Sequence, residues 1–92
     1  MNKNKLKNSL ITEDDFLVEK EFIIKNTNYN SCVEFYNSLG VYTVDDYIKM
    51  ASNPNINNLI AKNSKFSTFS EFCDETIKFV KSGLDEPFKS LF

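Results

Sequence analysis

Two pairs of adjacent carboxylates are the residues in this sequence best suited to chemistry, Asp14-Asp15 and Asp45-Asp46. Paired carboxylates can hold a divalent cation or act as general acid and general base. Neighbouring residues on a helix, however, point about 100° apart. Each pair also follows a threonine that could begin a helix, where acids complement the positive end of the helix dipole. We therefore predict that these carboxylates stabilise helix ends.

The composition removes most other catalytic and cofactor sites. The 92 residues include no histidine and no arginine. The usual Ser-His and Cys-His pairs, imidazole metal ligands and bidentate phosphate forks are therefore unavailable. Two glycines cannot build a glycine-rich phosphate cradle. We predict a protein that is not an enzyme and has no cofactor.

The charge also argues against nucleic acid as the partner. The formal net charge is −2, whereas nucleic-acid binders carry a basic surface. Residues 31–50 resemble a helix-turn-helix with Gly40 in the turn, but the second helix would present two carboxylates to the phosphates. A DNA-binding regulator with a lysine-rich N-terminal arm is the least favoured hypothesis; that arm would use Lys3, Lys5 and Lys7.

The expected setting is the cytoplasm. Cys32 and Cys73 lie in apolar patterns outside any CxxC pair, which favours buried free thiols and a reducing compartment. No apolar run is long enough to span a bilayer, so we expect no membrane contact. We predict a single helical domain over 1–92, in which 1–11 form a flexible basic tail.

One local pattern marks four helix starts. A hydroxyl residue is followed three positions later by an acid, as in a capping box, and an aromatic residue comes next. The four pairs are Thr12 and Asp15, Ser31 and Glu34, Thr43 and Asp46, and Thr68 and Glu71.

The apolar spacing then sets the helix limits. The first helix is predicted from Thr12 to about Lys25, with the acids Glu13 and Glu19 facing outward. Its inward side chains are predicted to be Phe16, Leu17, Phe22, Ile23 and Ile24. A second helix over 32–39 would end at a left-handed Gly40, although 31–52 could instead form one bent helix.

The C-terminal half is predicted in the same way. A third helix over 44–52 would stop before Pro54, and a last helix would cover 69–82. An apolar end with Phe88, Leu91 and Phe92 should fold back onto the helices. No segment alternates as a strand would, so the prediction is an all-α fold: a small antiparallel bundle of four to five helices with short loops.

Three stretches together resemble the colicin and pyocin DNase immunity proteins. "NPNINNLIAKN" at 53–63 resembles that family's His-Pro-x-x-x-Asp-Leu-Ile-Tyr-Tyr-Pro, with Pro54 and Leu59-Ile60 at the same separation. "LKNSLITEDDF" at 6–16 resembles its opening, and 68–79 resembles its last helix. The resemblance implies a four-helix bundle that binds a nuclease toxin beside its active site through the second and third helices.

The resemblance also implies a binding face on either side of Pro54. In this interpretation Asn55 or Asn57 caps a short helix that the Leu59-Ile60 pair anchors to the core. The predicted partner-binding residues are Tyr42, Asp45, Asp46, Lys49, Asn57, Asn58, Ala61 and Lys62. This chain has Ala61 and Lys62 where the family has two tyrosines, a departure that points to different contacts or a different target.

The leading hypothesis is a protein-binding inhibitor, an immunity protein that neutralises a bacterial toxin. The alternative is a small regulatory or anti-defence protein of a phage or mobile element, which would also act by protein-protein binding. Either protein would be a monomer or a weak dimer with a larger protein as partner. A toxin reading frame beside this one would favour the first hypothesis.

Overall fold

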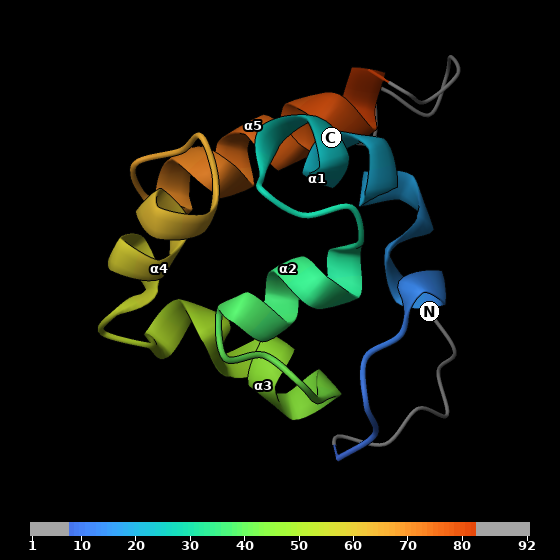
Figure 1. The fold of residues 1–92 in the computed structure, drawn as a ribbon, viewed down its shortest axis with the longest axis vertical. Coiled ribbons are helices and arrows are strands. Elements are labelled where there is room, and N and C mark those ends of the chain that lie inside the picture. The colour runs from blue at the N-terminus through green and yellow to red at the C-terminus, as the bar shows by residue number, and fades with distance from the viewer. Residues whose placement is uncertain (1–7, 83–92) are drawn as a thin grey trace.

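The structure, a computed structural model, describes residues 8–82, which form helices joined by short loops, with no β-strand in that range (Figure 1). This confirms the predicted all-α fold. Among the described residues, no helix is both long enough and apolar enough to cross a bilayer. The elements in chain order are the 3-10 helix η1 (Glu13–Glu19), α1 (Lys20–Asn26), α2 (Cys32–Ser38), α3 (Val44–Lys49), the 3-10 helix η2 (Met50–Ser52), α4 (Ile56–Asn63) and α5 (Phe69–Ser82).

The four predicted helix starts are all present. At α3, Thr43 Oγ1 accepts from Asp46 N at 3.1 Å, and Asp46 Oδ2 accepts from Thr43 N at 3.1 Å. Two donors at the exposed end of the helix are thereby paired. The other starts make corresponding contacts: Thr12 N to Asp15 Oδ2 at 2.8 Å, Glu34 N to Ser31 Oγ at 3.0 Å, and Glu71 N to Thr68 Oγ1 at 3.1 Å.

A tight C-terminal turn separates α2 from α3. Gly40 has φ +83°, which glycine adopts without the steric penalty of a Cβ atom. Val41 N donates to Tyr36 O, and Gly40 N donates to Asn37 O, both at 3.0 Å. These two bonds pair carbonyls that the helix end would leave free. The chain therefore forms two helices here instead of one long bent helix.

The prediction of one regular first helix is wrong. Phe16 has the non-helical angles φ −129° and ψ 24°, and the segment up to Glu19 is a 3-10 helix. The Phe16 ring stacks on Tyr36 with centroids 4.7 Å apart, so the backbone turns to bring this ring into the core. Leu17 and Ile24 are exposed, contrary to the prediction.

The core is built around stacked and tilted phenylalanine rings. Phe22 of α1 lies 5.7 Å from Phe66, 6.2 Å from Phe72 and 5.4 Å from Phe79, measured between ring centroids. These contacts hold α5 against α1. The largest fully buried side chains are Tyr36, Phe35, Ile23, Leu39, Ile60 and Cys32.

The short helix α4 is anchored as predicted, though more by one residue of the pair than by the other. Ile60 is fully buried, whereas Leu59 is half-buried and packs against the core. Ile56, one turn before Ile60, adds a second buried side chain that the sequence argument did not single out. The backbone N–H of Leu59 donates to Asn55 O at 3.0 Å, so the helix begins after Asn55, although no side-chain cap forms there.

The end of the predicted tail belongs to the fold. Ile11 is buried, and its backbone N–H donates to Tyr42 O at 3.0 Å. Val44 N donates to Ser9 O at 2.9 Å. These bonds tie the segment before η1 to the start of α3, so 9–11 are not a free tail. Residues 1–7 and the apolar C-terminal end lie outside the described range.

Candidate functional site

The predicted partner-binding residues fall into two groups on two helices. Tyr42, Asp45, Asp46 and Lys49 lie on or just before α3. The second group, on α4, comprises Asn57, Asn58, Ala61 and Lys62. All are exposed except the two aspartates, which are half-buried. Within the described part of the chain, no hydrogen bond or ion pair joins the two groups.

Two of these residues have structural roles. Asp46 Oδ2 accepts from Tyr42 N at 3.0 Å and from Thr43 N at 3.1 Å, and these two hydrogen bonds lower the pKa of Asp46. Asn57 Oδ1 accepts from Phe69 N at 2.8 Å and so ties α4 to the first residue of α5. Both side chains are therefore occupied in holding the fold together.

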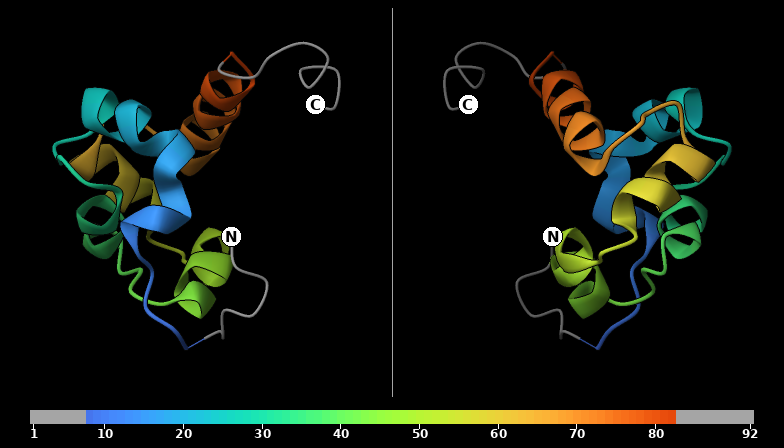
Figure 2. Two further views of the ribbon diagram at one scale, coloured as in Figure 1. Left: turned by 90° about the vertical axis from the view of Figure 1, so that its right-hand side faces the viewer. Right: turned by 90° about the vertical axis from the view of Figure 1, so that its left-hand side faces the viewer.

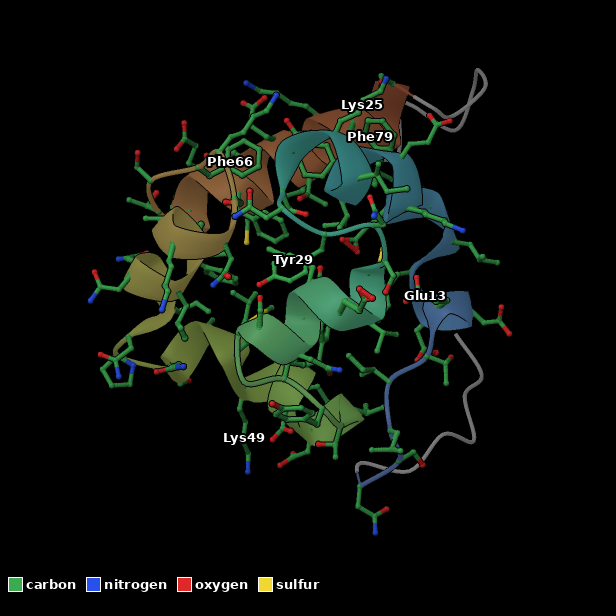
Figure 3. The ribbon with its side chains drawn as sticks, in the orientation of Figure 1. Glu13, Lys25, Tyr29, Lys49, Phe66 and Phe79 are labelled. Carbon is green, nitrogen blue, oxygen red and sulfur yellow. The ribbon has the colours of Figure 1, made fainter. Side chains whose placement is uncertain are left out.

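Two more of the predicted residues, Asp45 and Lys49, form a surface ion pair. Lys49 Nζ lies 2.9 Å from Asp45 Oδ2, one helical turn away, and the Lys49 side chain points away from the protein (Figure 3). The hydrogen bond that Lys49 donates to Asp45 raises the pKa of Lys49. Because the pair is open to water, it contributes little to stability. Of the predicted face, Tyr42, Asn58, Ala61 and Lys62 make no such side-chain contacts with other residues of the range 8–82.

An apolar cleft opens next to α3 that the sequence argument did not predict. Figure 2 shows α3 and α5 diverging from each other, and between them lies a cleft of about 390 Å³. Its walls include Tyr47, Ile48 and Met50 on one side and Phe69, Cys73 and Ile77 on the other. The two isoleucines at the rim stay largely in water, with 61% of Ile48 and 52% of Ile77 exposed. We call this hollow the α3–α5 cleft.

A carboxylate lies in this apolar surface. The Tyr36 hydroxyl donates to Glu19 Oε1 at 2.8 Å, and both residues line the cleft. No cation among residues 8–82 contacts Glu19. Burial raises the pKa of Glu19, and the hydrogen bond from Tyr36 offsets this only in part. The prediction that Glu19 faces outward is therefore wrong.

The carboxylate also affects its neighbours. Burial raises the pKa of Tyr47 and of the Cys73 thiol, and the charge of Glu19 raises both further. Cys73 is half-buried, not fully buried as predicted, and is free like Cys32. For Cys32, burial raises the pKa to about 12, with Glu19 as the next cause. Both thiols are thus held in the protonated, unreactive form at neutral pH.

Two further hollows differ from the α3–α5 cleft. A smaller one of about 100 Å³ shares Glu19 and Tyr47 with it and is closed by Ile11 and Val44. A wider hollow of about 630 Å³ follows the outside of α5, with charges of both signs along it. One helix and the loop before it form that hollow, so it lacks an opposing wall. No group of three or more metal-ligating side chains occurs in the described part of the chain.

Residue spacing does not indicate the cleft. Val44, Tyr47, Ile48 and Ala51 follow helical spacing, so this pattern predicts one buried face. The structure buries only Val44 among them and exposes the other three to different extents. Periodicity identifies the apolar side of a helix but does not show whether another element covers it.

No protein-family model, curated protein or solved structure matches the chain. The resemblance to the DNase immunity proteins therefore stays a prediction, and the following proposals are argued from the described residues.

Proposed function

We propose that this chain is an immunity protein, a non-enzymatic inhibitor that neutralises a nuclease-type bacterial toxin by binding beside its active site. The observation that carries the proposal is the exposed apolar surface of α3. Tyr42, Tyr47 and Ile48 expose 53%, 38% and 61% of their surface within one short segment. Grouped apolar side chains in water are a feature of protein-binding surfaces.

The side chains of Tyr42 and Ile48 are not required to hold α3 in place, whereas the Tyr47 ring packs against Phe16 and Tyr36. The start of the helix is fixed by the Thr43–Asp46 capping box and by the backbone bonds from Ile11 and to Ser9. Tyr42 contributes only backbone groups to these bonds. Its ring and the Ile48 side chain are therefore available to a partner. Tyrosine is among the residues that contribute most when buried in an interface.

The charge of the surface suits a nuclease. A protein that binds DNA phosphates presents basic side chains around its active site. The chain has a net charge of −2; Asp45 is paired with Lys49, so Asp46 and Glu19 supply the negative charge beside the apolar residues of α3. Acids next to an apolar patch would speed association with such a basic surface and select against acidic partners.

The position of the exposed aromatics also addresses the departure from the family pattern. The two tyrosines that the family carries on its third helix are Ala61 and Lys62 here, on α4. Two exposed tyrosines instead flank the capping box of α3. We therefore place the centre of the toxin contact on α3, with the exposed residues of α4 at its edge.

A neutralisation assay tests this function. The reading frame beside this one in the native genome is expressed in a heterologous bacterial host, alone and together with this chain. We expect that frame to kill the host with degradation of its DNA, and co-expression of this chain to restore growth. Tyr42→Ala and Ile48→Ala should reduce the rescue, whereas Ile24→Ala, which truncates an exposed apolar residue on α1, should not. A harmless neighbour, or killing that this chain does not relieve, contradicts the proposal.

A further inference from the structure

The α3–α5 cleft combines apolar walls with one half-buried carboxylate, and this combination specifies what can fill it. We propose that the cleft receives an arginine side chain of the partner protein, with the guanidinium against Glu19 and apolar neighbours of that arginine against Ile48 and Ile77. The inference rests on the proposed function, because it names the chemistry of the protein contact that the proposed function requires.

The charge balance of the cleft calls for a cation. Of the described residues that line it, Glu19 alone carries a charge, and its polar contact is the hydroxyl of Tyr36. The nearest lysine on α3, Lys49, is paired with Asp45 at 2.9 Å and lies outside the lining. A purely apolar partner would strip water from Glu19 and leave a buried unpaired charge, which is strongly unfavourable. A partner that supplies a cation avoids this cost.

The aromatic surroundings favour arginine over lysine. Tyr36 and Tyr47 both line the cleft, with ring centroids 5.4 Å apart in an edge-to-face arrangement; Tyr36 is almost fully buried, so Tyr47 offers the accessible ring. A planar guanidinium can lie on an aromatic face while donating two hydrogen bonds to one carboxylate. An ammonium is a more strongly hydrated point charge and is harder to bring into an apolar setting. Lysine should therefore bind more weakly than arginine.

The walls favour an amphipathic segment around the arginine. Ile48 and Ile77 stand on opposite sides of the opening and are both largely exposed. A cleft of about 390 Å³ accommodates a few side chains but not a whole helix. A partner helix would therefore lie across the opening and insert side chains from one face, the usual mode for a groove between helices.

The occupant must come from another protein. The chain contains no arginine, so neither its own segments nor a second copy can supply this group. The experiment accordingly uses the full chain and three synthetic helical peptides of about 15 residues, a length at which an isolated helix can form. The peptides share one leucine-rich face and differ at its central position, which is arginine, leucine or glutamate. Their affinities are measured by calorimetric titration at physiological salt.

We expect the arginine peptide to bind roughly tenfold more tightly than the leucine peptide, with the glutamate peptide weakest. Glu19→Gln should remove the preference for arginine while the leucine peptide still binds. Ile48→Ala and Ile77→Ala should weaken the arginine and leucine peptides alike, and the matched control Ile24→Ala should change nothing. Thermal unfolding of each variant checks that it is folded.

Four outcomes overturn the inference. The first is no binding by any peptide, and the second is equal binding by the arginine and leucine peptides. The third is an arginine preference that survives Glu19→Gln. The fourth is binding that appears only after Phe88 and Phe92 are changed to alanine. The last outcome would show that the chain's own C-terminal end fills the cleft. Rescue from the toxin without an arginine preference would refute this inference alone. An arginine preference without rescue would refute the immunity function and leave the cleft chemistry intact.

Discussion

The Tyr36 hydroxyl and Glu19 Oε1 are joined by a 2.8 Å hydrogen bond that links α2 to the end of η1. Tyr36 is almost completely buried, so this bond satisfies a hydroxyl that water cannot reach. Glu19 itself is half-buried, and its charge is partly shielded from solvent without a cation from the described residues. The bond therefore stabilises the fold, while the charge of its acceptor opposes folding.

Replacing that charge should stabilise the protein. Glu19→Gln retains an oxygen that can accept from Tyr36 and removes the buried charge, so we expect a gain on the order of 1 kcal/mol at neutral pH. Burial raises the folded pKa of Glu19 above its ordinary value of 4.5. Protonated Glu19 therefore contributes stability that is fully present below pH 4.5 and is lost as the pH rises through the raised pKa. Urea unfolding at a series of pH values measures both effects.

The matched control is Glu21→Gln, which neutralises an exposed carboxylate on α1. We expect it to change stability little at any pH, since its charge is already in water. Equal stability of wild type and Glu19→Gln at neutral pH would show that the buried charge carries no cost.

The opposite pH dependence is expected for Glu13. Its carboxylate accepts from Ser31 Oγ at 2.8 Å, Cys32 N at 3.0 Å and Val33 N at 2.7 Å, and so caps the start of α2 (Figure 3). Burial would raise the pKa of Glu13, but these hydrogen bonds outweigh it and hold the pKa below 4.5. The stabilisation is present above 4.5 and is lost as the pH falls through the lowered pKa.

We expect Glu13→Ala to cost about 1 kcal/mol at neutral pH, the usual value for a helix cap that is partly screened by water. The cost should shrink as the pH falls below the pKa. Asp14→Ala removes the exposed acid beside it and should have a much smaller effect. If the two variants unfold at the same urea concentration, the capping role is wrong.

These two glutamates show which contacts could be predicted from the sequence and which could not. The caps of α2, α3 and α5 depend on residues three positions apart, so local sequence predicts them well. Glu13 caps a helix 18 residues further along the chain, and Glu19 meets a tyrosine 17 residues away. Such contacts depend on how the helices pack, and residue spacing does not encode that.

The largest local error concerns the segment around Phe16. The predicted helix has Phe16, Leu17, Phe22, Ile23 and Ile24 on one inner face, but on a regular helix Phe16 and Phe22 would lie about 120° apart. Stacking of Phe16 on Tyr36 at 4.7 Å accompanies a different backbone path. Leu17 and Ile24 are exposed and Glu19 is half-buried. Glu19 lines the cleft together with residues of helices distant in sequence, so local spacing does not predict the cleft.

Gly40 provides a test of the turn between α2 and α3. A Cβ atom added at Gly40 would meet nothing within 4 Å, so only the left-handed backbone opposes a larger residue. We expect Gly40→Ala to lower the free energy of unfolding by roughly 1 kcal/mol, and Gly40→Asn to cost less because asparagine tolerates this conformation. Chemical denaturation of both variants measures the difference. An alanine variant as stable as wild type would contradict the strained turn.

The anchoring of α4 predicts unequal effects for its two aliphatic neighbours. Ile60 is fully buried, so Ile60→Ala should lower the free energy of unfolding by roughly 2 to 5 kcal/mol, the usual range for a cavity in a packed core. Leu59 is only half-buried, so Leu59→Ala removes less contact area and should cost clearly less. Asn58→Ala, on the exposed side of the same helix, is the matched control and should be nearly neutral. Thermal and urea unfolding of the three variants rank them. A larger loss for Leu59→Ala than for Ile60→Ala would mean that α4 packs through its other side, and the orientation of its exposed residues toward a partner would then be wrong as well.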